Sequence, residues 1–205
     1  PVPSVVTGYF TDRSIKTVAL PPIEKGENRI TLHLPYGKRT NVEWCYVLGA
    51  FGVQVAGTQK TVTPLPEKLA FADVTTQGLP FYGANIDYHI PVTMHEDAKL
   101  AVHASLYRGA LIGVSVDGER AGSIALPPYT CALPLKKGAH TLTLTLFGNR
   151  MNSFGQVHLV NTSHHWFGPS SYRTEDDNWS YEYQLKRFGI LKSPTLTEYT
   201  EEPAR

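Results

Sequence analysis

The strongest constraint on the fold is a strict alternation of apolar and polar residues that recurs along the chain. Residues 141–146, with the sequence Thr-Leu-Thr-Leu-Thr-Leu, show it most clearly. Successive side chains of a β-strand point to opposite faces, so a period of two predicts a half-buried strand rather than an amphipathic helix. Leu142, Leu144 and Leu146 are therefore expected to face a core, with the threonines between them facing away.

Three further segments carry the same alternation. The residues expected to face inward are Ile30, Leu32 and Leu34; Ile86, Tyr88, Ile90 and Val92; and Leu100, Val102, Ala104 and Leu106. Asp117 and Gly118 both tolerate positive φ, which predicts a type I′ turn between two short strands. Many short strands separated by turn residues are typical of a sandwich or jelly roll. The predicted fold class is therefore all-β, an antiparallel β-sandwich.

One sequence pattern occurs twice. In each copy a Lys-Gly turn precedes an alternating strand, and a basic loop with asparagine follows; the turn glycines, Gly26 and Gly138, are 112 residues apart (138 − 26). This spacing matches one sandwich domain of about 100 residues. We expect the first copy to be the closing half of a related sandwich whose opening strands lie upstream; the alternative is a sheet that belongs to the second sandwich. The predicted domains are this closing half (1–64), a linker (65–77), the main sandwich (78–193) and a tail (194–205).

The overall charge gives no reason to propose a polyanionic partner. The chain has 205 residues and a formal net charge of +1, and its basic residues are scattered. Nucleic acid and anionic membranes are therefore not expected as partners. No apolar run approaches the roughly 18 residues that a membrane-spanning helix needs.

The sequence lacks the common catalytic motifs. It contains no G-x-S-x-G, H-E-x-x-H or C-x-x-C pattern and no phosphate-binding glycine loop after a strand. Glycoside hydrolysis needs two carboxylates across the sugar, and only Glu43, beside Trp44, has an aromatic neighbour on a predicted strand. We expect a non-catalytic segment without a cofactor, and a complete small hydrolase is the alternative. A structural calcium ion on Asp176 and Asp177 is compatible with the acidic loop, which shows no ligand pattern.

Aromatic residues gather in residues 158–183. A long loop with many aromatic rings can bind sugars, because the C–H face of a pyranose stacks on a ring while polar side chains bond the hydroxyls. The predicted carbohydrate-binding residues are Trp166 as the platform, Tyr172 or Trp179 as a second wall, and His165, Arg150 and Asn152 as hydroxyl partners. The alternative is that these rings plug the end of the sandwich or pack on a neighbouring domain. Tyr181, Tyr183 and Leu185 alternate and are expected to form a closing strand.

Four segments of the chain resemble a known family. They are "GLPFYGANIDYHIPV", "VSVDGERAGSIALPPY", "LKKGAHTLTLTLFGNRMNSFGQVH" and "WSYEYQLKRFGI". Over about Gly78 to Pro194 they are similar to the galactose-binding-like, or sugar-binding-like, jelly rolls of large bacterial glycoside hydrolases of the β-galactosidase, β-glucuronidase and α-L-rhamnosidase types. Val116-Asp117-Gly118 corresponds to the family's V-N-G turn, 135–140 to L-K-x-G-x-N, and 152–158 to N-x-x-G-x-x-H. The chain departs from this pattern at His140, where the family has asparagine, and this change affects one hydrogen bond of the turn.

This resemblance implies an accessory domain of a glycoside hydrolase. The catalytic carboxylates of such enzymes lie on their barrel, and none of them maps onto this chain. The expected partners are a glycan or glycoside and the other domains of a parent enzyme. Since many such sandwiches only brace the catalytic domain, a purely structural role without a sugar site is the alternative.

Overall fold

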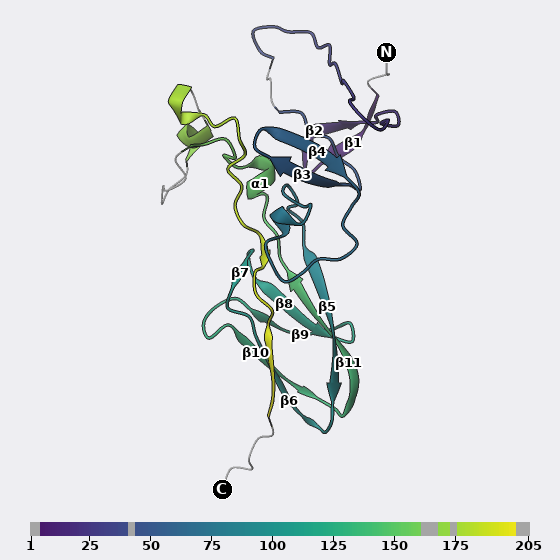
Figure 1. The fold of residues 1–205 in the computed structure, drawn as a ribbon, viewed down its shortest axis with the longest axis vertical. Coiled ribbons are helices and arrows are strands. Elements are labelled where there is room, and N and C mark those ends of the chain that lie inside the picture. Colours follow the sequence, from purple (N-terminus) through teal and green to yellow (C-terminus); the bar gives the residue numbers. More distant parts are fainter. Residues whose placement is uncertain (1–4, 41–43, 161–167, 173–175, 200–205) are drawn as a thin grey trace. The chain divides into compact units, whose positions relative to one another are not determined.

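Antiparallel pairing joins all neighbouring strands among the residues that the structure describes. The structure is a computed structural model, and it describes residues 5–40, 44–160, 168–172 and 176–199. The strands form several separate antiparallel sheets, which confirms the predicted all-β sandwich class (Figure 1). The chain divides into two compact units, unit 1 (Pro1–Val47) and unit 2 (Leu48–Arg205). The domain boundaries at residues 64, 77 and 193 stay a prediction.

The elements follow one another as short strands with few helical turns. Unit 1 contains the hairpin of β1 (Val6–Phe10) and β2 (Asp12–Val18). The strands of unit 2 are β3 (Gly52–Ala56), β4 (Gln59–Thr63), β5 (Ile86–Met94), β6 (Ala98–His103), β7 (Tyr107–Arg108), β8 (Ile112–Val116), β9 (Glu119–Ile124), β10 (Thr130–Leu135), β11 (Gly138–Leu146), β12 (Gly189–Ile190) and β13 (Thr195–Tyr199). Its helical turns are η1 (Val74–Thr76), α1 (Met151–Phe154), η2 (Pro169–Tyr172) and η3 (Asp176–Asn178).

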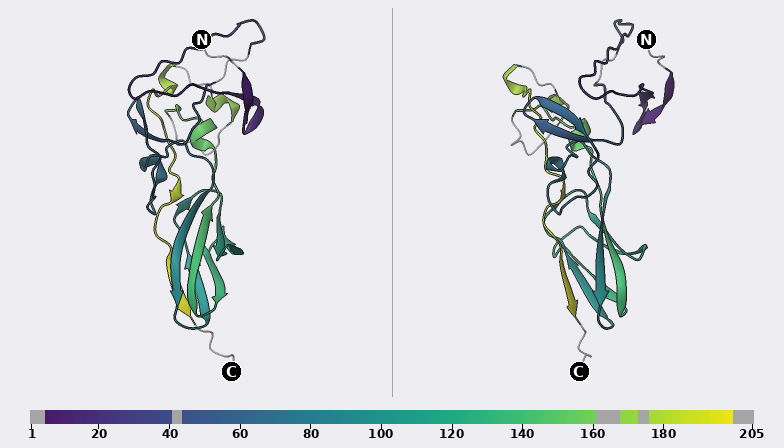
Figure 2. Two further views of the ribbon diagram at one scale, coloured as in Figure 1. Left: turned by 90° about the vertical axis from the view of Figure 1, so that its right-hand side faces the viewer. Right: turned by 45° about the vertical axis from the view of Figure 1, so that its right-hand side comes forward.

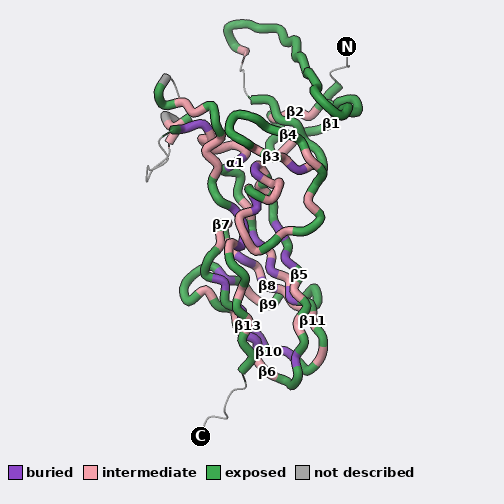
Figure 3. Tube along the Cα trace, viewed as in Figure 1, coloured by how far each residue is buried: buried purple, intermediate pink, exposed green. Residues whose placement is uncertain are grey.

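Two sheets of unit 2 enclose the core of the sandwich. One has four strands in the order β5-β11-β8-β9, and the other has three in the order β10-β6-β13 (Figure 2). Leu142, Leu144 and Leu146 of β11 are all 0% exposed, and they pack with Leu100 and Val102 of β6. Buried residues accordingly follow the strands of the sandwich in Figure 3. Removal of this apolar surface from water is the main term that holds the sheets together.

The alternation in the sequence predicted most of the inward faces correctly. Along β5, Ile86 and Tyr88 are buried and Ile90 and Val92 are half-buried, while the residues between them are exposed. Leu106 was predicted to face inward but is 43% exposed. β6 ends at His103, so the alternation no longer fixes a face there, and Tyr107 packs against the core instead.

The predicted hairpin turn is present between β8 and β9. Asp117 has φ 51° and Gly118 has φ 87°, and Val116 pairs with Glu119 across the turn. Two consecutive positive φ values give the turn the twist that the flanking strands need. The type I′ prediction is confirmed at this position.

The first copy of the repeated pattern does not form its predicted strand. Residues 28–36 carry no strand, and Ile30, Leu32 and Leu34 are 48%, 58% and 56% exposed. In the second copy, β11 pairs with β5 on one side and β8 on the other. No described strand pairs with residues 28–36, and a strand is stabilised by its cross-strand neighbours rather than by its own alternation. The prediction of a core-facing strand there was therefore wrong for this chain.

The predicted closing strand in the C-terminal region also needs correction. Residues 181–185 do not form a closing strand, because Ser180 Oγ donates to the Glu182 carbonyl at 2.9 Å and the Gln184 side chain donates to Ser180 Oγ at 3.1 Å. Such local hydrogen bonds compete with a ladder. The outer strand is instead β13, which lies in the predicted tail and pairs with β6.

The turn before the repeated strand, in contrast, has related geometry in both copies. Gly26 and Gly138 both have positive φ, at 113° and 143°. Two residues after each glycine, a side chain contacts the carbonyl four positions back: Asn28 Nδ2 donates to Glu24 at 2.8 Å, and His140 Nε2 lies 2.8 Å from the carbonyl of Lys136. His140 thus retains the turn hydrogen bond that its departure from asparagine put in question.

His140 also ties this turn to the β8–β9 hairpin. Its Nδ1 lies 2.7 Å from Asp117 Oδ2, while Asp117 Oδ1 accepts from the Thr141 N–H at 2.8 Å. Both ring nitrogens therefore face oxygen acceptors, and only the imidazolium form can donate to both. The Asp117 carboxylate, and then the Lys136 carbonyl, raise the pKa of His140 above its ordinary 6.5. The Thr141 N–H, and then His140, lower the pKa of Asp117 below 3.8.

This pair predicts a stability that depends on pH. Because folding raises the pKa of His140, its stabilisation is complete below pH 6.5 and is lost as the pH rises through the raised value; the contribution of Asp117 is lost below pH 3.8. His140→Asn, which introduces the residue found in the first copy, should lower the melting temperature at about pH 5.5 and change it much less at about pH 9. Thermal unfolding of both proteins across this range measures the difference. An equal difference at both pH values would contradict the assignment of an imidazolium.

Candidate functional site

Backbone hydrogen bonds hold two loop segments of unit 2 against each other. The N–H of Val160 donates to Asn178 at 3.0 Å, the N–H of Ser180 donates to His158 at 2.7 Å, and the N–H of Gln184 donates to Val157 at 2.6 Å. Leu159 and Trp179 form an isolated antiparallel bridge. We call residues 79–83, 148–160, 168–172 and 176–188 the loop end. Residues 157–160 and 178–184 of this aromatic region are thus held together by their backbone.

Aromatic rings pack into a cluster within the loop end. The rings of His158 and Trp179 are stacked with centroids 4.3 Å apart, and Tyr183 lies 4.6 Å from His158 and 4.9 Å from Phe81. Lys60 of β4 places its Nζ 5.0 Å from the centroid of the Tyr183 ring, a cation–π contact. His158 is 8% exposed, and its Nδ1 lies 2.8 Å from the Ser180 carbonyl, to which it can donate. We call Phe81, His158, Trp179 and Tyr183 the aromatic cluster.

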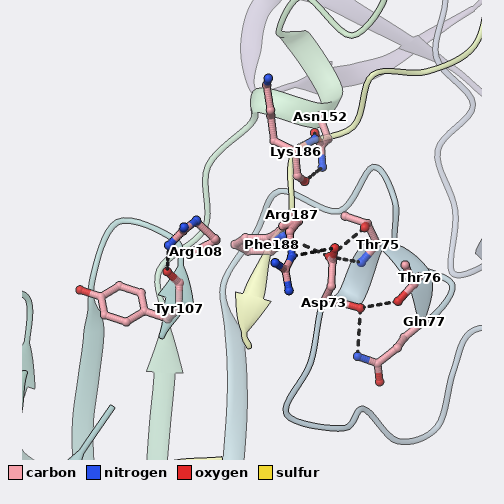
Figure 4. A network of polar contacts seen from close by, with 10 residues as sticks. All are labelled: Asp73, Thr75, Thr76, Gln77, Tyr107, Arg108, Asn152, Lys186, Arg187 and Phe188. Atoms are coloured by element: carbon pink, nitrogen blue, oxygen red, sulfur yellow. Dashed lines mark hydrogen bonds and ion pairs between the residues drawn. The ribbon is translucent and has the colours of Figure 1, made fainter. Parts of the chain in front are cut away.

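Asn152 is part of the framework and not of a surface. It is 6% exposed, its Nδ2 donates to the Lys186 carbonyl at 2.8 Å, and its Oδ1 accepts from the Lys186 N–H at 2.8 Å (Figure 4). A side-chain amide that makes this two-bond contact with a backbone leaves little capacity for a ligand. The predicted role of Asn152 as a hydroxyl partner is therefore corrected, because the amide holds residue 186 in place.

Asp73 anchors the residues that directly follow Lys186. Its Oδ1 accepts from the Thr75 N–H at 3.1 Å, from the Thr75 hydroxyl at 2.8 Å and from the Phe188 N–H at 3.2 Å. The Arg187 Nε lies 3.7 Å from Asp73 Oδ2. Figure 4 shows this network beside the Asn152–Lys186 contact. Together the two contacts fix residues 186–188, which connect the loop end to β12.

The other predicted sugar-binding residues do not form one group in the described structure. Trp166 and His165 lie outside the described residues. Trp179 is half-buried in the aromatic cluster, and Tyr172, at the end of η2, is 58% exposed. Arg150 is exposed at the N-cap position of α1, where Gly83 lets the two backbones approach: a methyl group on Gly83 would lie 3.3 Å from Cα of Arg150.

Two exposed tyrosines at the loop end were missed by sequence reasoning. Tyr181 is 78% exposed and lies between the cluster residues Trp179 and Tyr183; Tyr82, which follows Phe81, is 38% exposed. The alternation in "YEYQL" was interpreted as a strand, which assigned Tyr181 to a sheet. The signal that could have found it is the position of Ser180 before two alternating tyrosines, since serine favours local turns.

Metal ligands do not gather in the part of the chain that the structure describes. No group of three or more His, Cys, Asp or Glu side chains there could hold an ion. Asp177, one of the two predicted calcium ligands, is exposed. Glu43 lies outside the described residues.

Comparison with known proteins does not assign a family. No protein-family model matches the sequence, and no curated protein matches it. Among the described residues, no helix has the length and apolar character to cross a membrane.

Proposed function

We propose that this chain is a non-catalytic, accessory β-sandwich segment of a glycoside hydrolase and that its loop end binds glycan. The observation that carries the proposal is the Tyr181 ring, 78% exposed between two residues of the aromatic cluster. Trp179 is stacked on His158, and the Tyr183 ring packs at a tilt against His158 and edge-on against Phe81. The segment that presents Tyr181 is therefore anchored before any ligand arrives. Binding costs less when the surface is preorganised.

The chemistry of this surface suits a sugar. An exposed tyrosine offers a ring face for the C–H groups of a pyranose and a hydroxyl for its polar edge. Tyr172, 58% exposed, supplies a second ring in the same loop region. Glu182, which follows Tyr181 and is also exposed, adds a carboxylate that can accept hydrogen bonds from sugar hydroxyls. The resemblance of the sequence motifs to galactose-binding-like jelly rolls supports the same ligand class.

Binding of the whole chain to a glycan array tests the proposal. Tyr181→Ala and Tyr172→Ala should each weaken binding by about tenfold, since a stacked ring contributes on the order of 1.4 kcal/mol. Neither substitution should lower the melting temperature appreciably, because both side chains are largely exposed. Trp166→Ala belongs in the same set, because the sequence predicts a stacking platform at that position.

Tyr36→Ala is the matched control. Tyr36 is 82% exposed and belongs to unit 1, so Tyr36→Ala removes an exposed tyrosine that is not one of the residues of the loop end. Equal losses in Tyr36→Ala and Tyr181→Ala would contradict a specific site. A folded chain that binds no glycan would contradict the proposal as a whole.

A structural role within a larger enzyme is the second candidate. It is favoured by residues 28–36 of unit 1, whose apolar side chains Ile30, Leu32 and Leu34 are about half-exposed in a row. Apolar surfaces of this kind often mark contacts with another domain. The absence of glycan binding by a folded chain would favour this candidate.

A further inference from the structure

The outer face of the four-stranded sheet carries two rows of mostly polar residues. Since the leucines of β11 fill the core, the threonines between them lie on the opposite face. The pairing registers place these residues in two rows across β5, β11, β8 and β9. The first row is Asp87, Thr145, Gly113 and Ser123, and the second row is His89, Thr143, Ser115 and Arg120. All of them are exposed or half-buried.

Hydrogen bonds between neighbouring strands orient the polar groups of these rows. The Thr145 hydroxyl donates to Asp87 Oδ1 at 2.6 Å. His89 Nδ1 and the Thr143 hydroxyl lie 3.1 Å apart. A carboxylate has about four acceptor sites and a hydroxyl has two lone pairs, so both pairs keep capacity for a ligand while their geometry is fixed. The groups thus form an ordered set of donors and acceptors on a rigid sheet.

An aromatic ring lies beside the first row. Phe147 follows β11 and is 41% exposed. A methyl group on Gly113 would lie 3.2 Å from Cε2 of Phe147 and 3.7 Å from Cβ of Thr145. The absence of a side chain at Gly113 therefore lets the ring lie close to the sheet, next to the Asp87–Thr145 pair. A ring beside oriented polar groups is the combination that binds the two kinds of surface of a sugar.

The composition of the rows argues against the other common ligands. Their charged residues are Asp87 and Arg120, and the rows also contain His89 of β5, which is too few cations for a polyanion. A protein interface of normal size has an apolar centre, whereas the eight residues of these two rows include no large apolar side chain. The four strands span roughly 14 Å, which suits a short chain of sugar units.

We infer that this outer face, with Phe147 as the stacking ring and Asp87, His89, Thr143 and Thr145 as polar partners, is a second glycan site that binds a neutral oligosaccharide. The ligand class is that of the proposed function, but the residues are different. The proposed site at the loop end and the proposed site on the sheet face can therefore be tested independently.

The test is a titration of the intact, isotope-labelled chain with neutral tetrasaccharides of glucan, xylan, mannan and galactan type, followed by amide chemical shifts. The expected result is saturable shifts at Gly113, Thr143 and Thr145 with at least one of the sugars. Shifts confined to the loop end would overturn this inference and leave the proposed function standing. Shifts on the sheet alone would support the inference and contradict the loop-end site. No shifts with any of the four sugars would overturn both.

Three variants assign the contact. Phe147→Leu keeps an apolar side chain but removes the ring, and it should weaken binding on the sheet by about tenfold. Asp87→Ala should weaken binding on the sheet as well. Thr93 is exposed on β5, the strand of Asp87, but lies outside the two rows, so Thr93→Ala should leave this binding unchanged. Tyr181→Ala should leave the sheet shifts unchanged. Sheet shifts that follow the protein concentration and ignore the sugar would indicate self-association and would overturn the inference.

Discussion

Asn152→Asp is expected to lower the free energy of unfolding by about 3 kcal/mol at neutral pH. The amide nitrogen of Asn152 donates to the Lys186 carbonyl, and aspartate would place a carboxylate oxygen in its position, 2.8 Å from that carbonyl. The side chain is 6% exposed, so water cannot replace the lost hydrogen bond or screen the charge. Urea unfolding of the two proteins measures the change.

Asn149→Asp provides the matched control. Asn149 is exposed, and its Oδ1 accepts from the Met151 N–H at 3.0 Å, a bond that aspartate can also accept. The free energy of unfolding of the Asn149→Asp variant should therefore differ from that of the wild type by less than about 0.5 kcal/mol. If Asn152→Asp unfolds at the same urea concentration as the wild type, Asn152 does not hold residue 186, and its predicted role as a sugar contact should be reconsidered.

Leu144→Ala is expected to lower the free energy of unfolding by about 3 kcal/mol and the melting temperature by roughly 10 °C. Leu144 is 0% exposed in β11, between β5 and β8, so the sheet cannot close around the space that the truncation leaves. Differential scanning calorimetry measures both quantities.

Leu126→Ala makes the same chemical change at a surface position. Leu126 is 78% exposed, and its truncation should change stability by no more than about 0.5 kcal/mol. Similar effects of the two substitutions would mean that the core is not organised around β11.

The sequence could predict which faces of the strands are buried, because alternation is a local property of the chain. It placed Leu142, Leu144 and Leu146 inside and identified the Asp117-Gly118 turn. It could not predict which segments find neighbours. Residues 28–36 alternate as clearly as β11, yet only β11 has paired strands on both sides.

The candidate site was less predictable for a related reason. The aromatic content of residues 158–183 drew attention to the region of the proposed site, but exposure depends on contacts from distant segments. Trp179 is stacked on His158, whereas Tyr181, two residues later, is 78% exposed. Asn152 is polar and lies two residues after the basic Arg150, and only the contact with residue 186 reveals that its amide is already used.

The related turns at Gly26 and Gly138 bear on the order of folding. Residues 24–28 adopt their turn although the segment that follows has no paired neighbour among the described strands, so the turn does not depend on a sheet. In unit 2 the corresponding turn carries the chain from β10 in one sheet to β11 in the other. A local structure that needs no distant contact can form before the long-range pairings, which are slow because they close long loops. We therefore expect this turn to belong to the earliest part of the folding nucleus, where it commits the two adjoining strands to opposite layers before either has found its partners.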